Sequence, residues 1–179
     1  MIKKFSPLIF LIVFTFGPRA EAQNISIGGF IGGGTVEGFS ASTGAYTSSI
    51  FAELSTPFFG FNTRLSFVYG QDFNYLLPGS TNRYYPFLKA YTLKAIFTQP
   101  LSSPFYLEEG FGPAAIEDRT FSDVDEWNYG TAFSIAAGMD LREYKISGFK
   151  VGVGVEYSIT FGNTFAKYIS VHLQGQYYF

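Results

Sequence analysis

The sequence ends in ISVHLQGQYYF, residues 169–179, where apolar and polar side chains alternate without a break. One face would carry Ile169, Val171, Leu173, Gly175, Tyr177 and Phe179, and the other Ser170, His172, Gln174, Gln176 and Tyr178. Successive side chains of a strand point to opposite faces, so this stretch predicts a β-strand with one apolar and one polar face.

The same alternation recurs upstream. In FKVGVGVEYSITF, residues 149–161, large apolar side chains again take every second position, and the short loop 162–165 leads to the last strand. Six earlier strands are predicted at about 24–33, 48–56, 60–71, 84–98, 104–113 and 128–142. Their apolar faces would carry Ile25, Ile27, Ile31, Ile50, Leu54, Phe61, Leu65, Phe67, Tyr69, Phe87, Tyr91, Leu93, Phe97, Leu107, Phe111, Phe133, Ile135, Met139 and Leu141. The sequence therefore predicts an all-β chain of eight antiparallel strands.

Soluble barrels, such as lipocalin-like carriers, alternate in the same way as barrels that cross a membrane. The polar face separates the two, because a solvated exterior carries Lys, Glu and Asp, whereas here that face is mostly Gly, Ser, Ala, Thr and Gln. Small side chains suit the narrow interior of a barrel of about eight strands, and large apolar ones suit an exterior that faces lipid. We therefore expect a transmembrane antiparallel up-and-down β-barrel.

The predicted connections alternate between short and long. Tight turns are expected near 56–58, 99–104 and 143–147, and longer polar loops at 34–47, 71–83 and 114–127. This rhythm is typical of an outer-membrane barrel whose two termini face the periplasm. Aromatic residues gather at both ends as interfacial girdles would, with Tyr84, Tyr85, Trp127 and Tyr129 at the loop end, and Phe58, Phe59, Phe105, Tyr144 and Phe149 at the other.

Two charges interrupt the apolar face. Under strict alternation Lys89 and Glu109 would both point into lipid. A β-bulge that shifts the local register would remove them from that face, and a position at the membrane interface would make them tolerable. The sequence alone favours neither explanation.

The first residues predict a cleaved signal peptide, residues 1–22. Lys3 and Lys4 precede the apolar run 8–16, Gly17-Pro18 breaks it, and Ala20-Glu21-Ala22 has the small-x-small pattern of a cleavage site. An N-terminal membrane anchor is the alternative, but this run falls short of the roughly 20 apolar residues that a spanning helix needs. We expect the mature chain to be one barrel domain, 23–179.

The amino-acid composition also favours a barrel that spans a membrane. The chain has no cysteine for disulfides, and its net charge of −2 offers no attraction to nucleic acid. Its 20 Gly, 13 Tyr and 22 Phe, with only 15% charged residues, are unusual for a soluble surface. No mature segment is apolar enough for a transmembrane helix, so the chain can span a membrane only as a closed barrel, which pairs every backbone group in lipid.

The last six residues, QGQYYF, resemble the C-terminal signal that outer-membrane barrels present to the barrel assembly machinery, with Tyr177, Tyr178 and Phe179 as its aromatic residues. By its pattern the mature chain resembles the outer-membrane-protein β-barrel superfamily, the group of outer membrane proteins A and X. This resemblance implies the outer membrane of a Gram-negative bacterium as the location, with its lipid, its lipopolysaccharide and the assembly machinery as partners.

Several charges fall on the predicted inward face: Glu53, Arg64, Lys94, Glu108, Asp140, Arg142 and Glu156. A buried charge is costly unless it is paired, so opposite signs should meet inside the barrel. We expect Lys94 to pair with Glu108, because their strands are neighbours joined by a short turn. The set would form a structural plug, or, as the resemblance to outer membrane protein A allows, a gate in which the pairs exchange partners.

Three further patterns suggest chemistry. Ser170 and the single histidine, His172, share a face, and some small outer-membrane barrels use Ser, His and an acid to modify lipid A; interior filling is the alternative. The acidic loop residues Glu117-Asp118 and 123–126 lack the spacing of an EF-hand calcium loop, so we expect a solvated loop. The glycines at 28–29 and 32–34 precede no helix that would bind phosphate, so we interpret them as close packing.

The sequence therefore predicts a non-enzymatic outer-membrane barrel, without cofactor or metal, whose role is structural or depends on its surface loops. A narrow gated pore is the first alternative, and a lipid-modifying enzyme is the second. An envelope protein is a further possible partner that the sequence does not identify.

Overall fold

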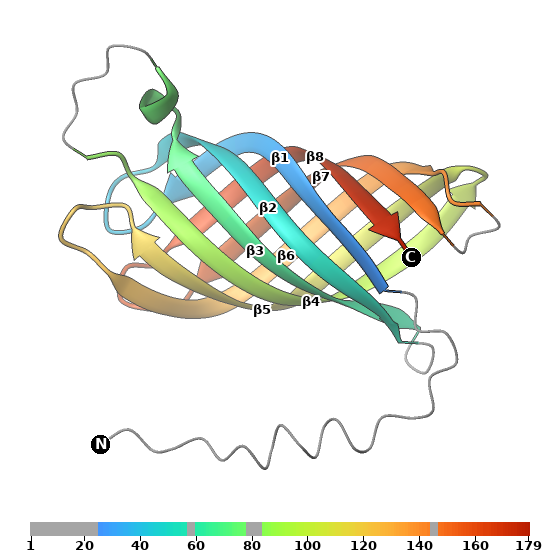
Figure 1. Cartoon of the computed structure of the whole chain (residues 1–179). Coiled ribbons are helices and arrows are strands. Elements are labelled where there is room, and N and C mark those ends of the chain that lie inside the picture. Colours follow the sequence, from blue (N-terminus) through green and yellow to red (C-terminus); the bar gives the residue numbers. More distant parts are fainter. Residues whose placement is uncertain (1–24, 57–59, 78–83, 144–146) are drawn as a thin grey trace.

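Eight antiparallel strands close into a barrel in the computed structural model, which describes residues 25–56, 60–77, 84–143 and 147–179 (Figure 1). The strands are β1 (Ile25–Glu37), β2 (Thr43–Thr56), β3 (Phe61–Asp72), β4 (Phe87–Ser102), β5 (Phe105–Arg119), β6 (Glu126–Asp140), β7 (Gly148–Thr160) and β8 (Lys167–Tyr178). Each strand pairs with the next, and β8 closes the barrel on β1. The predicted up-and-down topology of eight strands is confirmed.

The two ends of the barrel differ. The segments 38–42, 73–77, 84–86, 120–125 and 161–166 lie at one end, here called the loop end, and include the short 3-10 helix η1 (Phe73–Leu76). The other end, here called the turn end, holds the start of β1, the end of β8, and the ends at which β2 leads to β3, β4 to β5 and β6 to β7 (Figure 1). No helix among the described residues is long and apolar enough to cross a membrane.

The predicted faces match the structure in all eight strands. The exposed side chains on the outer wall are large and apolar, for example Ile31, Ile50, Leu65 and Leu173, and the alternate residues are buried inside. The aromatic residues predicted for the girdles that the structure describes lie near the ends of the barrel, with Trp127 and Tyr129 exposed toward the loop end and Phe105 and Phe149 toward the turn end. Phe58, Phe59 and Tyr144 fall outside the described residues.

The predicted extents of two loops were wrong. β1 continues to Glu37 and β2 begins at Thr43, so most of 34–47 is strand, and β5 and β6 likewise take up most of 114–127. The first segment is rich in Gly, Thr and Ser and the second in Asp and Glu, as loops are, yet the ladder continues into both because their inward side chains, such as Val36, Ala45 and Ile116, are fully buried.

A β-bulge does not account for the two charges on the apolar face. The β4–β5 ladder keeps one register from Phe87 to Pro100 and shifts only between Pro100 and Ser102. Lys89 therefore points outward, where it stands opposite Glu117 and forms an ion pair with it at 3.0 Å. Glu109 points outward as well, opposite Phe97 and Ile135.

The barrel interior has two layers. Toward the loop end it is filled by apolar side chains, namely Phe30, Val36, Ala45, Val68, Leu88, Ala90, Ile116, Ala166 and Tyr168. Toward the turn end it is filled by charged and amide side chains, which are described next. Both layers are buried, so the interior is packed along its length in the part of the chain that the structure describes.

Candidate functional site: the charged interior

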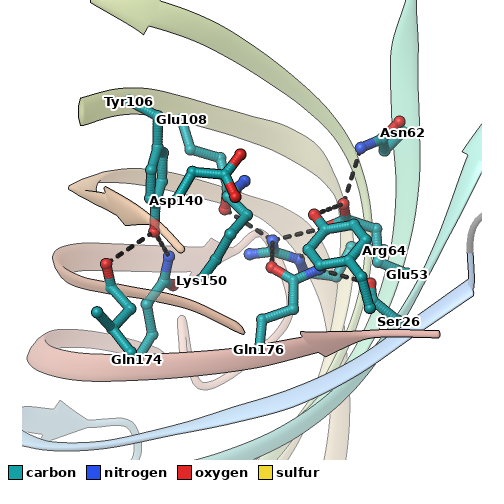
Figure 2. Close-up of polar contacts among 12 residues, drawn as sticks. Ser26, Glu53, Asn62, Arg64, Tyr106, Glu108, Asp140, Lys150, Gln174 and Gln176 are labelled. Carbon is teal, nitrogen blue, oxygen red and sulfur yellow. Dashed lines mark hydrogen bonds and ion pairs between the residues drawn. The ribbon is translucent and has the colours of Figure 1, made fainter. Parts of the chain in front are cut away.

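The largest group of interior charges is a chain of four side chains that crosses the barrel. Arg64 on β3 donates to Glu53 on β2 from both Nε and Nη2, at 2.8 and 2.6 Å. Its Nη2 also lies 2.7 Å from Oε1 of Glu108 on β5, and Oε2 of Glu108 accepts from Lys150 on β7 at 3.2 Å. Figure 2 shows Arg64 and Lys150 on either side of Glu108, so one network connects four strands.

Neutral side chains complete this network. Asn62 and the Tyr178 hydroxyl donate to Oε1 of Glu53, at 2.8 and 3.1 Å. Gln176 accepts from Arg64 and donates to Ser26 (Figure 2). A buried carboxylate keeps its charge at low cost only when its oxygens are well supplied with donors, and these bonds provide them.

Lys94 and Glu156 form a second, separate pair. The Lys94 ammonium donates to Oε2 of Glu156, and the Tyr168 hydroxyl donates to Oε1 at 2.6 Å. The predicted pair of Lys94 with Glu108 is wrong. The register sets Glu108 opposite Thr98, four residues beyond Lys94, and Lys94 extends from β4 across the interior to β7 instead.

Asp140 and Arg142 lie apart from both groups, at the turn end. Arg142 donates to Asp140 from Nε and Nη2, at 2.8 and 2.7 Å, and its guanidinium also lies 4.1 Å from the centre of the Tyr178 ring. The hydrogen bond from Arg142 to Asp140 raises the pKa of Arg142. The two side chains are only partly buried and line a cavity of about 390 Å³ with Tyr106, so they mark the edge of the packed interior.

The charges of the four-residue chain and of the Lys94–Glu156 pair balance. Glu53, Glu108 and Glu156 are matched by Arg64, Lys94 and Lys150, and all six side chains are at least 97% buried. The alternation places Lys150 on the same face as Glu156, and this signal identifies it from the sequence as an available cationic partner. The neutral donors Asn62, Tyr168 and Tyr178 carried no such signal, because polar interior residues are common in a barrel.

Ser170 and His172 are both buried inside the barrel. The Ser170 hydroxyl lies 3.3 Å from Nδ1 of His172 and 2.6 Å from the Thr47 hydroxyl. The His172 ring stacks on Phe30 with centroids 3.9 Å apart, and Gly32 leaves room for it, since a Cβ there would collide with His172. No carboxylate bonds to His172 among the described residues, so the pair lacks there the acid of a triad.

Acidic residues that the sequence places in the loop 114–127 form hydrogen bonds and an ion pair with other residues of the chain. Glu117 and Asp118 belong to β5, and Asp118 accepts from the Phe39 amide and from both the amide and hydroxyl of Thr120. Asp125 pairs with Arg119 at 2.5 Å. Within the described ranges, no group of three or more His, Cys, Asp or Glu residues is placed to hold a metal ion.

The C-terminal aromatic residues alternate as the sequence predicts. Tyr177 and Phe179 lie outside, with ring centroids 5.2 Å apart, and Tyr177 packs against Phe149. Tyr178 points inward into the charge network. The outer pair is therefore exposed on the wall of the last strand. The predicted signal peptide, 1–22, lies outside the described residues.

Comparisons with known proteins establish the fold. No protein-family model and no curated protein matches the chain. The structure is similar to that of Neisserial surface protein A, with a TM-score of 0.65 and 10% identity over 87% of this chain and 97% of that one. It is also similar to Ail, the attachment invasion locus protein of Yersinia pestis, with a TM-score of 0.53 and 15% identity over 88% of this chain and 97% of Ail.

Proposed function

Because the chain has the fold of the small eight-stranded outer-membrane barrels, we propose that it is a sealed, non-enzymatic scaffold in the cell envelope whose loops contact another molecule. The packed interior is the observation that carries this proposal. An ion that crossed the barrel would have to displace the apolar layer that includes Val36, Leu88 and Ile116, each with 0% exposure. Transfer of an ion through apolar surroundings is very costly, so the structure favours a plug over a pore.

The charge network supports the same role. A gate needs two arrangements of similar free energy. Here Arg64 is already shared by Glu53 and Glu108, and the remaining carboxylate oxygens accept from Lys150, Asn62 and Tyr178. Any exchange of partners would leave one of these buried groups unpaired, so the network favours one arrangement.

The loop end offers a contact surface. The loop 38–42 is tied to β5 and the loop after it, since the amides of Phe39 and Ser40 donate to Asp118 and Thr120 at 2.9 and 3.1 Å. Phe39 and Phe121 meet with ring centroids 5.9 Å apart, and both are exposed. These two residues, the tip patch, give the end of the barrel an ordered apolar surface of the kind that marks an interaction site.

Charge at this end constrains the partner. One structure of Ail contains the heparin analogue sucrose octasulfate. In this chain the described basic residues of the loop end, Lys89, Arg119 and Lys167, are each in an ion pair with a carboxylate. A sulfated polyanion would have to break those pairs, so the proposed partner is apolar and carries no strong negative charge.

Adherence of bacteria that express the full chain tests the proposed role of the loops. Replacement of Phe39 and Phe121 by Ser should reduce adherence to other cells at equal surface level, whereas Leu173→Ser, on the lipid-facing wall, has no effect on adherence of the molecules that reach the surface. Equal adherence of the tip-patch variant and the wild type would contradict the loop-mediated role.

A further inference from the structure

Glu109 is a lipid-facing carboxylate without a partner among the residues that the structure describes. It follows Glu108 directly, so its side chain leaves the opposite face of β5 from the interior network, and it is exposed. Its neighbours across the sheet are Phe97 and Ile135, both exposed on the same wall. No other residue in the described part of the chain forms a hydrogen bond or ion pair with Glu109.

Other charged residues on the outer face of the described strands form ion pairs within the chain. Lys89 pairs with Glu117 at 3.0 Å, Lys167 with Glu37 at 3.0 Å, and Arg119 with Asp125 at 2.5 Å. All three pairs lie toward the loop end. Glu109 alone, among the charges on the outer face of these strands, lies toward the turn end and lacks a counter-ion. An ionisable residue kept unpaired in a membrane-spanning segment indicates a function, since an apolar residue would cost less.

The position of Glu109 along β5 indicates which part of the membrane surrounds its side chain. It lies four residues along β5 from Phe105, the first residue after the β4–β5 turn. With a rise of about 3.3 Å per residue and a tilt of about 40°, this is roughly 10 Å above the turn. With the turn end on the periplasmic side, as the sequence predicts, this height places Glu109 in the inner leaflet of the outer membrane, within reach of the headgroups.

The outer wall around Glu109 is made of apolar side chains. Leu107 lies on the same face toward the turn, and Phe111 lies on the other side, packed against Phe133 with ring centroids 5.0 Å apart. These side chains, with Phe97 and Ile135, surround the single carboxylate with apolar surface. A ligand that fits must combine a cation with hydrocarbon.

A second copy of the chain does not supply that cation from its described residues. Toward the turn end, Arg64 and Lys150 point into the barrel, and Arg142 is bonded to Asp140. Two copies that met at this wall would instead bring their Glu109 carboxylates together, and like charges repel.

We propose that Glu109 binds the primary ammonium headgroup of an aminophospholipid in the inner leaflet, with the acyl chains against Phe97, Phe111 and Ile135. A primary ammonium donates hydrogen bonds to a carboxylate, and such charge-assisted bonds are the strong ones. The trimethylammonium of phosphatidylcholine carries the same charge but has no N–H to donate. The site therefore distinguishes two lipids of equal net charge.

Lipid retention tests the site directly. The mature chain is reconstituted in nanodiscs of equal phosphatidylethanolamine and phosphatidylcholine, transferred to mild detergent, and examined by native mass spectrometry for the lipids that stay bound. The wild type should retain phosphatidylethanolamine over phosphatidylcholine by about tenfold, the ratio that one charge-assisted hydrogen bond provides. Glu109→Gln should bring the ratio close to one.

Glu117→Gln is the matched control, because Glu117 lies on the same strand and face but has Lys89 as its partner; it should keep the wild-type ratio. If Glu109→Gln folds poorly, Glu109→Asp, which keeps a carboxylate, should retain the preference. Three results would overturn the proposal: an unchanged ratio in Glu109→Gln, a protonated Glu109 carboxyl in infrared spectra of the wild type, or a dimer that Glu109→Gln dissociates.

Discussion

The ammonium of Lys94 crosses the barrel interior from β4 to reach the carboxylate of Glu156 on β7. The two strands are not neighbours in the barrel, so this pair connects opposite parts of the wall. Both side chains are almost completely buried, and the only other hydrogen bond to the Glu156 carboxylate in the described part of the chain comes from Tyr168.

A double-mutant cycle measures this coupling. Lys94→Met or Glu156→Gln alone should lower the free energy of unfolding by about 3–5 kcal/mol, because each leaves a buried charge unpaired or a buried donor unsatisfied. The double variant should lose much less than the sum. Urea unfolding in lipid vesicles gives the three values. The cycle of Lys94→Met with Glu108→Gln is the control and should be additive, and coupling there but not with Glu156 would contradict the pairing described here.

Loss of Asp118 should loosen the loop end without unfolding the barrel. Asp118→Ala removes the acceptor for the amides of Phe39 and Thr120 and should cost about 1–3 kcal/mol. Hydrogen exchange should become faster in 38–42 and 120–125 and stay unchanged in β7 and β8. Asp123→Ala, an exposed change in the same loop, serves as the control. Equal protection of 38–42 in the wild type and Asp118→Ala would show that this loop is held by other contacts.

Deletion of Phe179 tests the predicted assembly signal. Phe179 lies exposed on the outer wall beside Tyr177, and its amide donates to the Ile25 carbonyl at 3.1 Å, so its loss removes one backbone hydrogen bond but no buried side chain. The truncated chain should therefore reach the periplasm but insert poorly into the outer membrane, as measured by fractionation. Deletion of Phe179 should leave the refolded barrel stable in detergent. This control distinguishes a defect in membrane insertion from a loss of folding stability. Normal amounts of the truncated chain in the outer membrane would show that Phe179 is not needed as an assembly signal.

The exterior predicts behaviour in detergent. Because the outer wall carries side chains such as Ile50 (69% exposed) and Leu173 (63% exposed), the folded chain needs detergent or lipid to stay in solution. Purified protein should give a β-type circular dichroism spectrum, and its gel mobility should differ between boiled and unboiled samples. A detergent-independent soluble monomer would show that the wall does not face lipid.

The strand number and the face of each residue could be predicted from the sequence, because alternation fixes which side chains point inward. The inward placement of Glu53, Arg64, Glu108 and Glu156 follows from this alone. The partners could not be predicted. In a closed barrel the shear determines which residues meet across the interior, and alternation carries no information on shear. Lys94 illustrates this, since its predicted partner lay on the adjacent strand and its actual partner lies on β7.

The ends of the strands were also beyond prediction. Residues such as Thr43, Gly44 and Thr47 have the composition of a loop, but they continue the ladder beyond the apolar part of the wall. The tie between Phe39 and Asp118 joins residues 79 positions apart in the sequence, and no local pattern indicates it.

Conductance of the purified mature chain in planar lipid bilayers tests the central claim, that the interior is sealed. The account predicts no channel activity for the wild type, because the apolar layer around Leu88 and Ile116 has no exposed surface and the charges below it are paired. The double variant Leu88→Ser, Ile116→Ser, which replaces the centre of that layer with polar groups, is the positive comparison and should conduct. Discrete openings of the wild type that disappear in Lys94→Met would contradict the account and favour a gated pore.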